Sequence, residues 1–451
     1  METVPKLSGN LAIALSAAAD ALAQVARGTA LDHALLVRAA SLAAPERAAA
    51  QDIAYSACRR LNLLDAIAAR LMAKPNPAVD SLVRVALSEL IDHAPERTHV
   101  IVDQAVTAAA GIAQGAYKGL VNGVLRSFVR GQEELLRQLR SDEVLRFGYP
   151  LWWIERIRQA WPSDWQAILE SGNQPPPMTL RVNLRRSTVD EYAARLEAAG
   201  IRARRSGPVA LALERAMPVV RLPGFAEGLV SVQDLGAQWA AHLLTADCAH
   251  GLRRDGRLRV LDACAAPGGK AAHLLESIDC ELLALDSDAT RLVAIGANLD
   301  RLGLRAQCRA ADAADLDAWW DGLGFDLILL DAPCTASGVV RRHPDGKWLK
   351  RASDVAQLAR IQRRLLDALW RVLKPGGKLL YATCSLFPEE NTGQVAAWLS
   401  RHPDARHLAP ASEPEVPATA AAPGIGLQRS GAQLLPGPLH DGFFYALFEK
   451  A

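Results

Sequence analysis

The sequence lacks several features that would assign it to a familiar class. Its seven cysteines are an odd number and include no Cys-x-x-Cys pair, which argues against a disulfide framework and against a zinc site. No run of about 18 uncharged apolar residues occurs, so we expect no membrane span. The formal net charge is only +2, so any binding of nucleic acid has to come from local basic patches. A protein of the reducing cytoplasm without a metal site fits these absences best.

The composition favours a globular protein with several domains. Hydrophobic residues make up 50% of the 451 positions, so the chain has ample material for packed cores. This length exceeds that of one ordinary domain, and two or three are expected. Residues 1–140 are rich in Ala and Leu and are interrupted by glycine and proline, which predicts an all-helical first domain.

The last helix of that domain is expected to include Lys118–Arg126. This segment resembles the terminal helix of the NusB family of RNA-binding antitermination factors. The pattern is compatible with a packed helix, with contact to RNA, and with both at once. The apolar stripe of the predicted helix consists of Leu120, Val121, Val124, Leu125 and Phe128.

Residues 141–225 are predicted to form a small α+β module. We expect strands over Met178–Asn183, around Val209–Leu213 and around Val219–Leu222, with an amphipathic helix over Val189–Gly200. Few acids are interspersed among the arginines of this region, which favours a face that follows RNA phosphates over an ordinary solvated surface. The arginines concerned are Arg181, Arg185, Arg186, Arg202, Arg204 and Arg205.

The remaining residues, 226–451, are expected to form a catalytic domain organised around Val260–Lys270. A short apolar strand there leads into small residues and two glycines, and a helical pattern begins after Lys270. A strand, a Gly-rich turn and a helix open a nucleotide-binding α/β domain with a doubly wound parallel sheet.

Two common nucleotide-binding motifs are absent from this turn. The dinucleotide motif G-x-G-x-x-G does not occur, and the phosphate loop requires Gly at position 264 and Ser or Thr at position 271, which are Cys and Ala. We therefore expect a cofactor that carries adenosine but no triphosphate. S-adenosylmethionine is the leading candidate.

Two acids follow predicted strands of this domain. Asp286 ends the second strand and lies 18 residues past Gly268, close to where an acid binds ribose hydroxyls. Asp312 ends a weaker third strand; it suits the amino group of adenine, and a helix N-cap explains it equally well. The Pro-, Ala- and Glu-rich segment 411–426 is expected to be a mobile loop, and Asp441–Phe448 a final strand.

Two cysteines follow two further apolar strands. Cys334 comes after a strand that begins at Phe325, and Cys384 ends a strand that begins at Gly377. Sequential strands in such sheets usually neighbour each other, and ligands bind at their carboxyl ends. We therefore expect both thiols, 50 residues apart in the sequence, to face the cofactor crevice, and at least one to act in catalysis.

A thiol at this place suits methylation of carbon 5 of a pyrimidine. Carbon 5 is a poor nucleophile toward a methyl sulfonium, but addition of a thiolate to carbon 6 makes it enamine-like. An unperturbed cysteine is only a few per cent ionised near neutral pH, so the site has to favour the thiolate, through Lys270 or a helix N-terminus. Asp331, on a turn made rigid by Pro333, is placed to bond either the base edge or the methionine part of the donor.

Three motifs in order resemble those of the RNA cytosine-C5 methyltransferases: Cys264-Ala-Ala-Pro-Gly-Gly-Lys270, Asp331-Ala-Pro-Cys334 and Thr383-Cys384. With Arg341–Trp348 and the NusB-like front end, they indicate the members that modify ribosomal RNA of the small subunit. The resemblance covers nearly the whole chain. It implies an all-α NusB-like N-terminal domain, a small α+β middle module and an α/β Rossmann-like methyltransferase domain. It also implies 16S ribosomal RNA as substrate and S-adenosylmethionine as methyl donor.

The resemblance implies roles for individual residues as well. Cys384 is expected to attack carbon 6, and Cys334 to assist release of the methylated RNA. The RNA is expected to be naked or part of an early small-subunit particle, and the protein to be a monomer. The donor-binding positions of the family correspond to Cys264, Ala265, Ala266, Pro267, Gly268, Gly269, Lys270, Asp286, Asp312 and Asp331.

The basic stretch from Arg341 to Arg351 is expected to overhang the crevice where a flipped-out base enters. Its Trp348 is more simply explained as a buried anchor than as a platform for a base. The alternative functions are a tRNA cytosine-C5 methyltransferase and a non-catalytic NusB-like RNA-binding factor. A comparison of methylation of stripped small-subunit RNA and of bulk tRNA distinguishes the rRNA enzyme from the tRNA enzyme. Failure to bind S-adenosylmethionine would favour the non-catalytic factor.

Overall fold

The computed structural model describes residues 10–246, 252–253, 256–408, 426–428 and 431–451. The chain forms two compact units. The first comprises the residues up to Gln174 together with Val340–Arg351, and the second comprises Pro175–Val339 and Ala352–Ala451. None of the helices in the described ranges combines the length and the apolar character needed to cross a bilayer.

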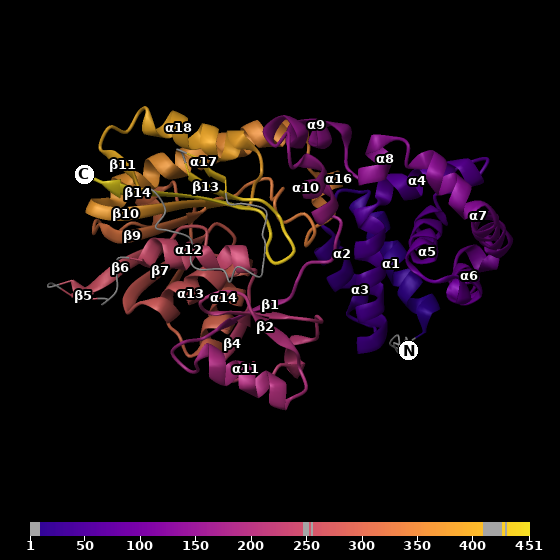
Figure 1. Cartoon of the computed structure of the whole chain (residues 1–451), viewed down its shortest axis with the longest axis horizontal. Coiled ribbons are helices and arrows are strands. Elements are labelled where there is room, and N and C mark those ends of the chain that lie inside the picture. Colours follow the sequence, from indigo (N-terminus) through magenta and orange to yellow (C-terminus); the bar gives the residue numbers. More distant parts are fainter. Residues whose placement is uncertain (1–9, 247–251, 254–255, 409–425, 429–430) are drawn as a thin grey trace. The chain divides into compact units, whose positions relative to one another are not determined.

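The first unit is built from helices throughout its described residues, in agreement with the prediction for residues 1–140. Most of the helices are short and joined by tight turns (Figure 1). They are α1 (Leu11–Val25), α2 (Leu31–Ala39), α3 (Ala44–Arg59), α4 (Leu61–Leu71), α5 (Asp80–Asp92), η1 (Pro95–Arg97), α6 (Thr98–Ala109), η2 (Ala113–Gly115), α7 (Lys118–Leu139), α8 (Glu143–Phe147), α9 (Leu151–Ala160), α10 (Trp165–Ser171) and α16 (Gly346–Leu349).

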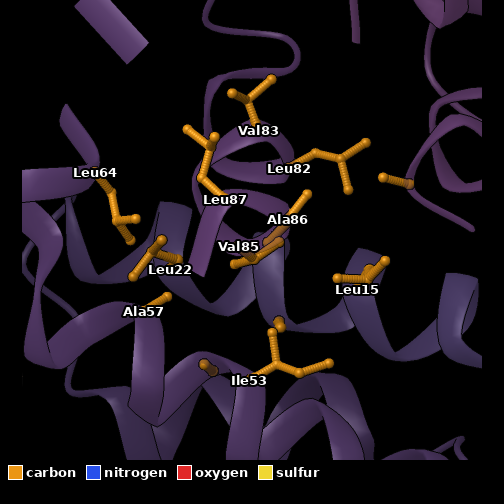
Figure 2. Close-up of a cluster of buried hydrophobic side chains, with 14 of the residues drawn as sticks. Leu15, Leu22, Ile53, Ala57, Leu64, Leu82, Val83, Val85, Ala86 and Leu87 are labelled. Atoms are coloured by element: carbon orange, nitrogen blue, oxygen red, sulfur yellow. The ribbon is translucent and has the colours of Figure 1, made fainter. Parts of the chain in front are cut away.

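The core of this unit surrounds α5, a helix that is apolar on most of its circumference. Leu82 and Leu87 of α5 are at most 2% exposed. Such a helix needs partners on all sides, and α1, α3, α4, α6 and α7 supply them. Figure 2 shows Leu15 and Leu22 of α1 and Ile53 of α3 gathered around the side chains of α5.

Helix α7 contains the segment that resembles NusB. Four of the five apolar residues predicted for its stripe are buried, while Leu120 is 38% exposed. The buried residues repeat at positions three and four apart, and Leu120 lies at the edge of that face. They are Val121, Val124, Leu125 and Phe128.

The segment Val340–Arg351 lies in the first unit, although its flanking residues belong to the second. The Lys347 ammonium is fully buried there and donates hydrogen bonds to the carbonyl oxygens of Arg59 (2.9 Å) and Gly148 (3.1 Å) and to the side chain of Asn173. Burial holds the pKa of Lys347 well below its usual value. Lys347 therefore holds separate segments of the first unit together through hydrogen bonds.

Two cations of the basic stretch Arg341–Arg351, which was expected to overhang the crevice, are buried in the first unit. Arg341 is only 3% exposed, and Lys347 is not exposed at all. Trp348 is partly buried against the core of the first unit and donates from its indole Nε1 to the carbonyl oxygen of Cys58 (2.8 Å), as expected for an anchor, the simpler of the two roles considered. Arg341 and Lys347, which the sequence pattern suggested would contact RNA, are instead packed inside the first unit.

The second unit begins with a four-stranded antiparallel sheet in the order β2 (Ala203–Arg205), β3 (Ala210–Leu213), β1 (Thr179–Val182) and β4 (Val230–Val232). Helix α11 (Val189–Ala198) covers it, and a capping box at Thr188 and Glu191 fixes the start of that helix.

The strand predicted around Val219–Leu222 is wrong. Residues Val219–Arg221 form a short 3-10 helix, η3, and the fourth strand is β4 further along. Pro218 and Pro223 flank the segment and leave too few backbone donors for a ladder.

Three of the six arginines expected to follow RNA phosphates are bound within the protein. Arg181 is not exposed at all. Arg185 donates to the carbonyl oxygen of Ile278 (2.8 Å), and Arg186 donates to that of Glu227. Arg185 and Arg186 are nevertheless exposed, as are the other three arginines, Arg202, Arg204 and Arg205, which lie on or beside β2.

The rest of the second unit is a twisted sheet with helices on both faces. Its main strand order is β12-β13-β14-β10-β9-β6-β7-β8. The strands from β10 to β8 are parallel, as predicted, and β14 pairs antiparallel with β10. The bounds are β5 (Leu252–Arg253), β6 (Gly256–Asp262), β7 (Cys280–Asp286), β8 (Gln307–Ala310), β9 (Phe325–Asp331), β10 (Leu373–Thr383), β11 (Ala405–Leu408), β12 (Gly426–Gln428), β13 (Gly431–Leu434) and β14 (Phe443–Lys450).

Two apolar clusters pack against this sheet, one on each face. In Figure 1, α17 and α18 lie on one side and α12, α13 and α14 on the other. The segment 411–426, expected to be a mobile loop, lies outside the described residues except for Gly426. The helices of this unit are α12 (Leu235–Thr245), α13 (Gly269–Ser277), α14 (Ala289–Leu302), α15 (Leu316–Trp319), α17 (Ala352–Val372), η4 (Pro388–Glu390) and α18 (Thr392–Leu399).

Candidate active site

A cavity of about 430 Å³ opens at the carboxyl ends of the parallel strands. It lies where the strand order reverses, since β6 pairs with both β7 and β9. Ligands of doubly wound sheets bind at such a switch point. Seven of the residues predicted for the site line the cavity: Cys264, Ala266, Asp286, Asp312, Asp331, Cys334 and Cys384.

The turn between β6 and α13 holds the backbone close to the sheet. Gly268 has a φ of +93°, and a Cβ atom there would lie 3.1 Å from Cγ2 of Ile295, so this position requires glycine. The Gly268 N–H donates to the carbonyl oxygen of Ala265 (2.6 Å). The other predicted loop residues shape the turn and the start of α13 but do not line the cavity; they are Ala265, Pro267, Gly268, Gly269 and Lys270.

Asp286 ends β7 and is 4% exposed. Its two carboxylate oxygens accept hydrogen bonds from the backbone N–H groups of Ala266 (3.1 Å) and Asp288 (3.1 Å). The guanidinium of Arg291 lies 3.5 Å from the same carboxylate. These contacts fix the carboxylate at the edge of the cavity, where hydroxyl groups of a ribose could donate to it.

Asp312 follows β8 and is tied on both sides. One oxygen accepts from the Ala314 N–H (2.9 Å), and the other accepts from Arg364 of α17 (2.7 Å). The next helix has its N-cap at Asp315, so Asp312 stabilises a turn and does not cap a helix. Its place in the cavity wall is compatible with the expected contact to adenine.

Lys270 and Asp331 form a partly buried ion pair with Nζ 2.5 Å from the carboxylate. Burial lowers the pKa of Lys270, but the Asp331 carboxylate, with Cys384 and Asp262, outweighs that effect and raises it, so the lysine remains a cation. Cys384 is thus among the groups that interact with Lys270 electrostatically. The lysine expected to favour a thiolate is therefore already paired with Asp331.

The two predicted thiols face each other, with their sulfur atoms 3.4 Å apart. The adjacency follows from the sheet, because β9 and β10 are parallel neighbours and Asp331 lies opposite Ala382. A hydrogen bond to Cys384 and burial raise the pKa of Cys334 well above its usual value. Cys334 is therefore a protonated thiol near neutral pH.

Sequence reasoning missed the residues that reach the cavity from helices. Ile361, Arg364 and Leu365 of α17 share one face by their spacing, but nothing local marks the face that borders the site. Arg291 also lines the cavity and bonds the carbonyl oxygen of Ala266 (2.9 Å). Arg291 lies in the first turn of α14, shortly after Asp286, and this position in the sequence could have indicated that it borders the site.

The residues of the cavity fit S-adenosylmethionine. A buried, hydrogen-bonded carboxylate stands at the end of the second parallel strand, where a ribose binds. Ala311 and Ala313 leave room in the wall, and Ile361 and Leu365 offer apolar surface to a flat base.

Three family models match successive parts of the chain. They are the NusB family over residues 13–130, the RsmF/B-like ferredoxin-like domain over residues 149–220, and the 16S rRNA methyltransferase RsmB/F over residues 251–449. Their order reproduces the predicted order of helical domain, α+β module and Rossmann-like domain.

Full-length relatives show the same relationship. The chain is 43% identical to ribosomal RNA small subunit methyltransferase B of Vibrio cholerae, over 96% of this chain and 97% of that protein. It is 41% identical to the protein of that name from Klebsiella pneumoniae, over 96% and 97% of the two chains. A methyltransferase homologue from Pyrococcus horikoshii aligns in structure with a TM-score of 0.57 and 29% identity, over 69% of this chain and 98% of the other.

These matches confirm the resemblance inferred from the three motifs and the choice of S-adenosylmethionine as methyl donor. The chain belongs to the RsmB/F family of 16S rRNA methyltransferases.

Proposed function

We propose that the chain methylates carbon 5 of a specific cytosine in 16S rRNA, and that Cys384 acts through a covalent bond to carbon 6. The observation that carries this proposal is the pair of sulfur atoms 3.4 Å apart in the wall of the cavity that fits the methyl donor. S-adenosylmethionine, when bound, supplies an electrophilic methyl group.

The turn Cys264–Lys270 and three acids would hold the donor. Asp286 would accept from the ribose hydroxyls, since its carboxylate is buried and fixed at the end of β7. Asp312, in the cavity wall, would bind the adenine, and Asp331, which pairs with Lys270, would bind the methionine part. Cys264 and Ala266 complete the wall.

Cys384 is the nucleophile. Its thiolate adds to carbon 6 of the cytosine, and carbon 5 then takes the methyl group as an enamine carbon. A base then takes the proton from carbon 5, the electrons of that carbon–hydrogen bond re-form the C5–C6 double bond, and the Cys384 sulfur leaves carbon 6 as a thiolate. The Lys270 cation lies close enough to Cys384 for the two groups to interact electrostatically.

Cys334 assists the release of the product. It keeps its proton and hydrogen-bonds Cys384, so it stabilises the negative charge that returns to the Cys384 sulfur when the carbon–sulfur bond breaks. Without this thiol the methylated RNA stays attached.

The other parts of the chain bind the RNA. We assign residues 1–140 to a NusB-like RNA-binding domain, 141–225 to a small RNA-binding module and 226–451 to the catalytic domain. The exposed arginines on and beside β2 contribute to the second of these. The protein works as a monomer in the cytoplasm on naked 16S rRNA or an early small-subunit particle.

Two single variants test the cysteine roles. Cys384→Ala should abolish methylation of stripped 16S rRNA and any covalent protein–RNA complex, because no thiolate then reaches carbon 6. Cys334→Ala should accumulate a complex that survives denaturing electrophoresis. The matched control is Cys308→Ala, an exposed cysteine on β8 outside the cavity.

Three results would contradict the proposal. Exchanged behaviour of the two cysteine variants would overturn the assignment of the nucleophile. Faster methylation of bulk tRNA than of 16S rRNA would overturn the substrate. Absence of S-adenosylmethionine binding in calorimetry would overturn the catalytic role altogether.

A further inference from the structure

The residues that follow the two cysteines share one buried carboxylate. Thr335 comes directly after Cys334, and its N–H and hydroxyl both donate to Glu390 (2.9 and 2.6 Å). Ser385 comes directly after Cys384, and its hydroxyl donates to the same Glu390 oxygen that accepts the threonine hydroxyl (2.5 Å). One side chain thus bonds the loops that carry both sulfurs.

Glu390 is fixed from a third direction as well. Gln362 of α17 donates to its carboxylate (3.0 Å) and to the carbonyl oxygen of Pro333 (2.9 Å), and the Tyr381 hydroxyl donates to its backbone oxygen (2.6 Å). The glutamate is 0% exposed, and burial raises its pKa while the hydrogen bonds oppose that change. Several donors on one buried carboxylate make a rigid arrangement.

The two loops also bond each other directly. The Gly338 N–H donates to the carbonyl oxygen of Cys384 (2.8 Å), and the Leu386 N–H donates to the hydroxyl of Ser337 (2.8 Å). These bonds keep the loops adjacent. The carboxylate bonds the residues next to the cysteines themselves, so it governs where the sulfur atoms lie.

We propose that Glu390 is a positioning residue for the methyl transfer, because its carboxylate sets the separation of the Cys334 and Cys384 sulfur atoms. Its printed hydrogen bonds go to neither sulfur, although its charge helps to raise the pKa of Cys334, and it does not line the cavity. It should therefore affect the thiol steps and not the binding of the methyl donor. This inference rests on the cysteine roles proposed above.

The first test is kinetic and uses Glu390→Gln, which keeps the size of the side chain but removes its charge and half of its acceptors. We expect the turnover number to fall by about 10- to 100-fold, the range for misplaced reacting groups. The KM for S-adenosylmethionine should stay within twofold. The matched control is Glu389→Gln, because Glu389 is the exposed neighbour on η4.

The second test measures the separation of the sulfurs without any reaction. Phenylarsine oxide binds two thiols held close together through one arsenic atom, so the unchanged protein should bind it and Cys334→Ala should not. Glu390→Gln should bind it at least tenfold more weakly, and Glu389→Gln as well as the unchanged protein. Melting temperature and S-adenosylmethionine binding are measured on the same samples to confirm the fold.

Thr335→Val gives an independent measurement if Glu390→Gln fails to fold. It removes one hydroxyl bond to the carboxylate at nearly constant volume and keeps the N–H bond. Its arsenical affinity and turnover should fall together, by less than for the glutamine variant.

The outcomes separate this inference from the proposed function. If arsenical binding falls while turnover does not, or turnover falls while arsenical binding does not, Glu390 does not act through the sulfurs. Unchanged values of both also overturn the inference. Activity retained by Cys384→Ala instead overturns the cysteine mechanism, and the arsenical result still reports the role of Glu390 in placing the thiols.

Discussion

Two of the buried ionisable side chains in the second unit, Arg181 and Asp262, have completely different surroundings. Arg181 of β1 is 0% exposed and donates to both carboxylate oxygens of Glu276 (2.8 Å each). It also donates to Gln233 (2.5 Å) and to the carbonyl oxygen of Gly269 (2.7 Å), at the start of α13. Every nitrogen of this guanidinium has a partner.

Asp262, the last residue of β6, is also 0% exposed, but neither of its carboxylate oxygens has a hydrogen-bond partner among the described residues. Burial, together with the neighbouring charge of Asp331, raises its pKa to about 8. Unpartnered buried carboxylates are costly and rare.

The comparison separates a structural charge from one that belongs to a functional site. The arginine joins the four-stranded sheet to the cofactor turn and is satisfied within the protein. The aspartate lies near the cavity residues Asp286 and Asp331, and its carboxylate oxygens have no hydrogen-bond partner among the described residues. A buried polar group without a hydrogen-bond partner lowers stability, so its presence at the edge of a binding site indicates a functional requirement.

Arg181→Met should produce the largest effect. It leaves Glu276 buried without its cation, a loss of roughly 3–5 kcal/mol in the free energy of unfolding. Urea denaturation of the full chain measures it. The KM for S-adenosylmethionine should also rise, because the bond to Gly269 is lost.

The matched control for this change is Arg204→Met, an exposed arginine of the same module, which should alter the free energy of unfolding by no more than about 0.5 kcal/mol. The double variant Arg181→Met with Glu276→Leu should recover much of the loss. Equal losses for the single and double variants would show that the ion pair is not the source.

Asp262→Asn should have an intermediate effect that depends on pH. The unfolded aspartate releases its proton near the ordinary value of 3.8, whereas the folded one keeps it up to about 8. Between these values the folded state binds more protons than the unfolded state, so the unchanged protein loses stability as the pH rises. Above about pH 8 the loss is complete and stability no longer changes through this group. Asparagine does not titrate, so the variant should gain on the unchanged protein by at most roughly 2–3 kcal/mol between pH 6 and pH 8.

Denaturation at several pH values without S-adenosylmethionine measures that difference. Asp326→Asn is the contrasting control: this aspartate is also buried in the sheet but accepts from the Arg259 N–H (2.9 Å) and from Lys374 (3.0 Å), so its replacement should destabilise. A constant difference between Asp262→Asn and the unchanged protein across pH 4–8 would contradict the raised pKa.

The same contrast explains how much the sequence could predict. The convergence of Cys334 and Cys384 was predictable, because strand order and the carboxyl-end rule place the ends of neighbouring parallel strands together. Asp286 was predictable for the same reason. These predictions depend on topology, which the pattern of apolar runs encodes.

The partners of individual charges were not predictable. Arg181 and Lys347 lie in basic stretches of the kind that contact RNA, yet both are buried and bound to groups distant in the sequence. Nothing local marks the role of Glu390, since two of the residues that donate to its carboxylate, Thr335 and Gln362, lie 55 residues earlier and on α17. Only the folded chain shows which charged groups pair with each other, so the sequence pattern counted buried cations such as Arg181 and Lys347 as parts of exposed basic faces.

Arg204→Glu should produce the smallest effect on stability, and it tests whether the exposed arginines of the middle module serve RNA. The side chain lies on β2 and is exposed, so the free energy of unfolding should change by no more than about 0.5 kcal/mol. Binding of 16S rRNA should weaken, and the slope of log affinity against log salt should fall by about 1, because one phosphate contact is lost. Arg202 and Arg205 have acidic neighbours at 3.8 and 3.2 Å, so the same change there should matter less. Titration of a labelled 16S rRNA fragment at several salt concentrations measures both quantities, and an unchanged slope would place the RNA on another surface.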